Sequence, residues 1–179
     1  VEDGKVQLTD PVSKYLPSFK NPMVSVPTFD PVFNGVTFRL MPAQREPSIQ
    51  DILRHTSGIA YGELTKNTLV RDAYIKAGVF KPDLDYDART LSGKEMAEGL
   101  GKAPLAQQPG TAWEYSLSVD VQGRVVEAVT GMRLNDFMQE RLFKPLKMKD
   151  TGFSVAPQNL GRLAEAFPKD PATGMDNKL

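Results

Sequence analysis

The 179-residue sequence predicts an α+β chain that is mostly helical and contains few strands. Capping-box patterns at 48–51 and 92–95, each a serine followed three residues later by an acidic residue, predict two helix starts. Residues 118–129 carry apolar side chains at helical spacing and are followed by a glycine, which predicts the clearest helix. Between residues 18 and 47, only the segment 36–40 has a strand-like pattern.

The N-terminal part of the chain is expected to contain a short helix and then irregular structure. Asp10 is the expected N-cap, Pro11 the first helical residue, and Pro17 ends the helix. Five prolines then recur between residues 18 and 47, with Asn and Gly among them. Apart from 36–40, this spacing predicts irregular chain.

The remaining elements follow from apolar spacing and from the residues that break it. The helix that begins at Ser48 is expected to end near His55, and Gly58 suits a C-terminal cap or a turn. Helices are also expected around 69–77 and over roughly 135–143.

Composition and charge exclude several classes of function. Lys+Arg and Asp+Glu both number 22, so the chain has no electrostatic footprint for nucleic acid or for an anionic membrane. No apolar stretch reaches the roughly 18 residues of a membrane span. The absence of cysteine excludes disulfides and thiolate chemistry but leaves the compartment open between cytoplasm and periplasm, with the cytoplasm preferred.

The common motifs that activate a serine nucleophile do not occur in the chain. It has no Gly-x-Ser-x-Gly elbow, and no serine is followed three residues later by lysine. That Ser-x-x-Lys spacing would bring the amine beside the hydroxyl within one helical turn. Walker and Gly-x-Gly-x-x-Gly motifs are also missing, so nothing supports a nucleotide cofactor.

His55 is the only histidine, and two hypotheses concern it. It would be a general base for Ser57 as nucleophile, or both would hydrogen-bond within a tight turn closed by Gly58. The structural hypothesis is favoured, because residues so close in sequence at a helix end point in different directions. One histidine without cysteine also makes a transition-metal site improbable.

Tyr115 is the candidate that the residues alone leave open. It follows the Pro109-Gly110 turn and precedes the apolar helix, so a strand-to-helix junction would let its phenol project into a cleft. A phenol acts as a base only where cations lower its pKa from about 10. From these residues alone, a tyrosine in the core or at its rim is the favoured interpretation.

Four segments resemble, in order and over most of the chain, those of class C β-lactamases and of related family VIII carboxylesterases and penicillin-binding proteins. They are Glu2–Pro17, Ser48–Gly58 with its His-Thr-Ser-Gly run, Pro109–Gly131 around Tyr115, and Leu142–Phe153. The resemblance identifies the sequence as a member of the serine β-lactamase-like superfamily and implies a β-lactamase/transpeptidase-like fold.

The resemblance also implies that residues 1–179 are a partial domain, the helical domain plus part of the α/β domain. The family's Ser-x-x-Lys segment is expected before Val1, and its Lys-Thr-Gly-like or Trp-Gly-Gly-like strand after Leu179. The complete protein is then expected to be roughly twice this length. Its remaining part would be a partner of this chain, which alone would be inactive.

By resemblance, Tyr115 is the family's catalytic tyrosine and acts as general base in acyl transfer to and from the serine. No cofactor or metal is implied, and the substrate is a small ester or lactam. Tyr61, Trp113 and Leu117 are candidate substrate-binding residues. Class C β-lactamases carry Asn at the position of Leu117, so the change favours a carboxylesterase over a β-lactamase.

Three other functions stay open. The protein would be a β-lactamase, a D-Ala-D-Ala peptidase or transesterase, or a non-catalytic binding module of the same fold. The missing Ser-x-x-Lys pair motivates the last of these.

Overall fold

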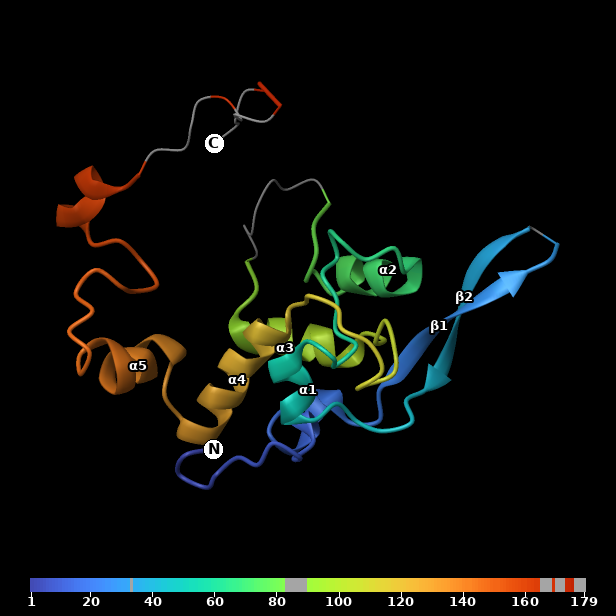
Figure 1. Ribbon diagram of the computed structural model, residues 1–179, viewed down its shortest axis with the longest axis horizontal. Coiled ribbons are helices and arrows are strands. Elements are labelled where there is room, and N and C mark those ends of the chain that lie inside the picture. Colours follow the sequence, from blue (N-terminus) through green and yellow to red (C-terminus); the bar gives the residue numbers. More distant parts are fainter. Residues whose placement is uncertain (33, 83–89, 165–168, 170–172, 176–179) are drawn as a thin grey trace. The chain divides into compact units, whose positions relative to one another are not determined.

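A computed structural model describes residues 1–32, 34–82, 90–164, 169 and 173–175 (Figure 1). The chain divides into two compact units, Val1–Leu134 and Asn135–Leu179. The first unit consists of short helical turns, one β-hairpin and α-helices, and its described part has no other strand pairing longer than a single bridge. This confirms the prediction of a mostly helical chain with few strands.

The elements of the first unit occur in a simple order along the chain. They are the 3₁₀ turns η1 (Val12–Lys14) and η2 (Pro17–Phe19), the strands β1 (Met23–Asp30) and β2 (Gly35–Pro42), and the helices α1 (Ile49–Arg54), α2 (Thr68–Lys76), α3 (Gly93–Lys102) and α4 (Ser118–Thr130).

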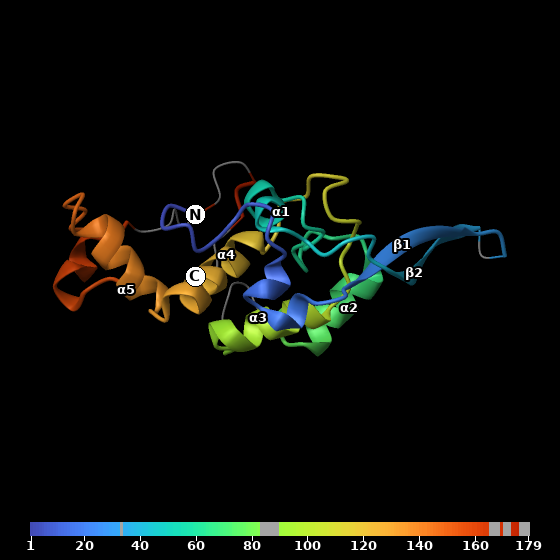
Figure 2. The ribbon, with the colours of Figure 1, turned by 90° about the horizontal axis from the view of Figure 1, so that it is seen from below.

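The β-hairpin corrects the expectation of irregular chain over residues 18–47. Strand β1 pairs antiparallel with β2 from Met23 opposite Pro42 to Asp30 opposite Gly35. The prediction failed at β1 because Pro27 interrupts it, and proline cannot donate to a ladder. In a two-stranded ribbon, however, alternate amides of each strand face away from the partner, so one proline is tolerated. In both views the hairpin projects from the helices of its own unit (Figures 1 and 2).

The first predicted helix is shorter than expected. Residues Val12–Lys14 form a 3₁₀ turn, and Pro11 is its extended N-cap residue instead of its first helical residue. Pro17 does not simply end the segment but begins the second 3₁₀ turn, Pro17–Phe19. Proline suits this first position because the amide that it lacks would have no helical acceptor there.

Helix α1 begins at the predicted capping box. The Ser48 hydroxyl accepts from the Asp51 amide at 3.2 Å, and the Asp51 carboxylate accepts from the Ser48 amide at 2.8 Å. His55 ends the helix in the left-handed conformation with φ 56°. Gly58 therefore lies in the turn that follows and is not the helix cap.

The other predicted helices of this unit are confirmed. Ser92 and Glu95 form the second capping box at the start of α3. Gly131, at φ 69°, ends α4. The core lies where α1 and α3 pack against α4 and η2 packs against α3. Its largest fully buried side chains are Tyr74, Phe19, Ile52, Ile59, Leu100, Leu105, Leu117, Val12, Val24, Val70, Val79 and Val121.

The second unit contains most of α5 (Leu134–Met138), the π-helical turn η3 (Gln139–Phe143) and the 3₁₀ helix η4 (Pro157–Arg162). The helix predicted over roughly 135–143 is present, with its last five residues in the wider π form. Within the parts of the chain that the structure describes, no helix is both long and apolar enough to cross a membrane.

The Asp51 carboxylate connects the start of α1 with the turn after it. Arg45 donates to both of its oxygens, at 2.5 and 3.0 Å, and the Thr56 hydroxyl donates at 3.1 Å. Burial alone would raise the pKa of Asp51. The Arg45 guanidinium and the Ser48 amide and hydroxyl outweigh burial and lower the pKa to about 2.

We expect this carboxylate to make stability depend on acid. Its pKa in the folded protein lies below the ordinary 3.8, so its contribution is present above that value and is lost as the pH falls from about 5 to about 2. Asp51→Asn should lower the free energy of unfolding at neutral pH by about 1–3 kcal/mol and flatten this acid dependence. Urea unfolding at several pH values measures both.

Asp150→Asn is the matched control for Asp51. It removes a carboxylate that pairs with Arg162 at 2.7 Å, but both side chains are more than half exposed. We expect its effect at neutral pH to be much smaller than that of Asp51→Asn, because water screens an exposed ion pair. Equal losses for the two variants would contradict the role given to Asp51.

Gly58 is expected to tolerate no side chain. Its φ is 84°, and an added Cβ would lie 2.4 Å from the Gln107 carbonyl oxygen. Gly131 has a similar φ of 69°, but nothing lies within 4 Å of its added Cβ. Gly131→Ala should therefore cost about 1 kcal/mol for the left-handed backbone alone. Gly58→Ala should cost at least about 1 kcal/mol more by thermal denaturation, and an equal cost would show that the loop moves aside freely.

Candidate active site

Tyr115 lies in an extended segment that leads into α4. The phenol side is open to solvent, with Tyr115 52% exposed, while the next three residues, Ser116 to Ser118, are buried. Residues 111–117 contain no strand, so the expected strand-to-helix junction is wrong. The segment is held by hydrogen bonds to the end of α1 and not by a sheet.

His55 supplies those hydrogen bonds. Its backbone carbonyl accepts from the Glu114 amide at 2.9 Å. Its ring Nδ1 accepts from the Ser116 amide at 3.2 Å, and the Ser116 hydroxyl oxygen lies 3.1 Å from the same nitrogen. Tyr115 is therefore the residue between two amides that His55 binds.

Four aromatic rings gather around this contact. The His55 ring centroid lies 5.0 Å from that of Tyr115 and 6.3 Å from that of Trp113. The Tyr61 ring lies 5.4 Å from the Tyr115 ring. Three of the four residues expected at the site from the sequence, Tyr61, Trp113 and Tyr115, are thus brought together.

Leu117 is not part of this group. It is the N-cap residue of α4, only 2% exposed, and belongs to the hydrophobic core. Its burial favours a packing role over direct contact with a substrate. The resemblance in sequence related the apolar side chain of Leu117 to substrate choice. In the structure this side chain packs in the hydrophobic core.

Three buried serine hydroxyls form a connected ladder behind Tyr115. Ser57 Oγ lies 2.9 Å from Ser118 Oγ, which lies 2.8 Å from Ser116 Oγ. All three residues are completely buried. The hypothesis of His55 as base for Ser57 is therefore unsupported, because the Ser57 hydroxyl is inaccessible and bonds to Ser118. The sequence could not show the ladder, since its halves are 61 residues apart.

The groups next to Tyr115 are two aromatic rings and, one residue earlier in the chain, the carboxyl of Glu114. Neither ring in contact with Tyr115, that of His55 or that of Tyr61, is a fixed cation. Burial raises the pKa of the neighbouring Glu114 above its usual range. In the described part of the chain, no group of three or more His, Cys, Asp or Glu side chains is placed to hold a metal ion.

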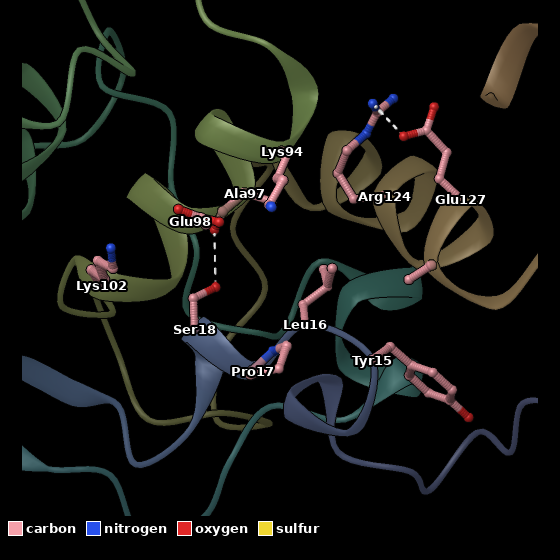
Figure 3. Close-up of a pocket in the computed structure, with 11 residues that line it drawn as sticks. Tyr15, Leu16, Pro17, Ser18, Lys94, Ala97, Glu98, Lys102, Arg124 and Glu127 are labelled. Atoms are coloured by element: carbon pink, nitrogen blue, oxygen red, sulfur yellow. Dashed lines mark hydrogen bonds and ion pairs between the residues drawn. The ribbon is translucent and has the colours of Figure 1, made fainter. Parts of the chain in front are cut away.

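A separate pocket of about 800 Å³ lies in the same unit, between η2, α3 and α4. Leu16, Ala97 and Arg124 are among the residues that line it, and an Arg124–Glu127 ion pair of 2.8 Å stands at its edge (Figure 3). None of the site residues expected from the sequence lines this pocket. It is therefore distinct from the aromatic group around Tyr115.

Known proteins resemble this chain in sequence and in fold. The chain is 33% identical over 159 residues to esterase EstB of Burkholderia gladioli, covering 87% of this chain and 34% of that protein. It is 30% identical over 180 residues to lovastatin esterase of Penicillium rubens, covering 96% and 40%. The structure of unliganded simvastatin synthase (LovD) from Aspergillus terreus matches with a TM-score of 0.72 at 25% identity, covering 97% and 40%.

The chain thus spans well under half the length of the relatives that it matches. The structural match confirms the β-lactamase/transpeptidase-like fold expected from the sequence. The family model described as Beta-lactamase matches residues 1–178. The chain therefore belongs to the Beta-lactamase family.

Proposed function

We propose that the protein is a serine hydrolase of the carboxylesterase type, in which Tyr115 is the general base. The observation that carries the proposal is a half-exposed phenol on a backbone held on both sides by His55. Such a side chain is accessible to a substrate and is carried by a fixed backbone, which suits proton transfer. Similarity to two proteins named as esterases supports the ester class.

The proposed reaction proceeds through an acyl-enzyme. The Tyr115 phenolate accepts the proton of a serine hydroxyl as that oxygen attacks the ester carbonyl. The tetrahedral intermediate then expels the alkoxide, which takes the proton from the Tyr115 phenol and leaves as the alcohol. Water repeats the two steps to release the acid. The serine, and the lysine that favours the phenolate, are expected in the remainder of the protein.

The residues around Tyr115 favour an ester over a lactam. Leu117 is buried and apolar, so position 117 offers no amide to a lactam substrate. The Tyr61 ring lies beside the Tyr115 ring, and the ring of Trp113, a residue that is 67% exposed, lies against the other ring of the site, that of His55. We propose these two rings as an apolar wall for the acyl or alcohol part of the ester.

Transfer of the acyl group to an alcohol is the second candidate function. It needs the same base and the same acyl-enzyme, with an alcohol in place of water. The similarity to a protein of Aspergillus terreus named as a methylbutanoyltransferase, 27% identical over 176 residues, favours it. Adding a primary alcohol to the assay and measuring the new ester separates the two outcomes.

Removing the Tyr115 hydroxyl should abolish most turnover. In the complete protein, we expect Tyr115→Phe to lower kcat for a p-nitrophenyl ester by at least about 100-fold, because the serine loses its proton acceptor. Tyr15→Phe is the matched control, since it removes a phenol hydroxyl that bonds to Asp10 and lies outside the aromatic group. Activity like the wild type in Tyr115→Phe would refute the proposal.

A fluorophosphonate probe distinguishes an enzyme from a non-catalytic module of the same fold. We expect the probe to label one serine of the complete protein, outside residues 1–179, because no serine of this chain has the lysine three residues later that would activate it. Ser57, Ser116 and Ser118 are also buried. Peptide mass spectrometry locates the labelled serine. No labelling at all would favour the binding module.

A further inference from the structure

We infer that His55 is a positioning residue for Tyr115, acting through ring Nδ1 as a hydrogen-bond acceptor. This inference rests on the proposed function, in which Tyr115 is the base, and it identifies the residue that positions Tyr115. His55 holds the amide before Tyr115 with its carbonyl and the amide after it with its ring. A shift of the His55 ring would therefore move the backbone that carries the phenol.

The partners of Nδ1 decide which proton the ring carries. A backbone amide can only donate, so Nδ1 must accept from the Ser116 amide at 3.2 Å. The neutral imidazole then carries its proton on Nε2. With Nδ1 occupied and Nε2 protonated, neither nitrogen is available to take a proton from a nucleophile. The ring therefore positions the base and is not the base.

The end of α1 fixes His55 itself. The amides of His55 and Thr56 both donate to the Asp51 carbonyl. The left-handed backbone at φ 56° turns the chain sharply at this residue, and histidine is among the few non-glycine residues found there. Arg45 and Ser48 in turn hydrogen-bond the Asp51 carboxylate. The helix end that carries the His55 ring is therefore held in one position.

Ser116 is held from its other side by the serine ladder. Its hydroxyl lies 2.8 Å from Ser118 Oγ, and the Ser118 amide donates back to it at 3.4 Å. The ring of His55 also contacts the Tyr115 ring directly, at a centroid distance of 5.0 Å. Two features of His55 therefore touch the site, the Nδ1 acceptor and the ring face, and they can be separated by substitution.

A matched pair of substitutions isolates the acceptor. Asn and Gly both adopt the left-handed backbone readily, and neither provides a ring. The Asn side-chain oxygen can replace Nδ1 as acceptor for the Ser116 amide, whereas Gly offers nothing. In the complete protein we expect His55→Asn to keep kcat for a p-nitrophenyl ester within about fivefold of wild type. His55→Gly should lower kcat by roughly 10- to 100-fold with a smaller change in KM.

The comparison decides the inference in either direction. Equal kcat values for the Asn and Gly variants, whether high or low, would overturn it, because the acceptor would then make no difference. If His55→Gly does not fold by thermal melting, His55→Ala replaces it, since Ala also lacks the acceptor and adds only a methyl group at this left-handed position. The Ala variant should be as slow as expected for Gly, and wild-type activity in it would overturn the inference.

Tyr115→Phe, measured in the same assay, separates this inference from the proposed function. Wild-type activity in Tyr115→Phe would refute the function whatever the His55 variants do. An inactive Tyr115→Phe together with equal Asn and Gly variants would refute only the positioning role of His55.

Discussion

The geometry of the site depends on one short stretch of chain, the end of helix α1 from Asp51 to His55. The Asp51 carboxylate caps the start of the helix and binds Arg45 and Thr56, while its carbonyl accepts the amides of His55 and Thr56. A buried carboxylate in this position is stable only because it has several donors. The same contacts that satisfy its charge also fix the turn that aims the His55 ring.

The turn at His55 also positions a segment that is distant in sequence, residues 114–116. His55 binds the chain on both sides of Tyr115, and Ser57 joins the serine ladder that leads to Ser116. The site therefore combines an exposed phenol with a fully hydrogen-bonded polar layer beneath it. Buried polar groups that all have partners hold their neighbours in one arrangement, which is the property that a proton-transferring side chain requires.

What could be predicted from the sequence was local in origin. The capping boxes at Ser48 and Ser92 act over three residues, so their helices were predicted correctly. Strand β1 was missed because Pro27 breaks the local pattern, and only pairing with β2 explains why the strand tolerates it. The contact between His55 and Ser116 joins residues 61 apart, and no spacing rule anticipates such a contact.

The candidate site shows the same division. Tyr115 was singled out through the resemblance of the segments around it, and the structure brings it beside Tyr61 and His55, whose ring also contacts that of Trp113. Leu117 looked like a site residue because of its place in the motif. In the structure it is the N-cap residue of α4 and is buried in the core. The resemblance thus predicted the candidate residues, while packing determined which of them lie together.

The serine ladder also has a direction. The Ile59 amide donates to Ser57 Oγ at one end, and the unprotonated Nδ1 of His55 lies beside Ser116 Oγ at the other. The hydroxyl protons can therefore all point the same way, from Ser57 through Ser118 and Ser116 toward the imidazole. Dipoles aligned in this manner polarise one another. In this arrangement each hydroxyl directs its hydrogen toward His55, and the last hydrogen, that of Ser116, faces the lone pair of Nδ1.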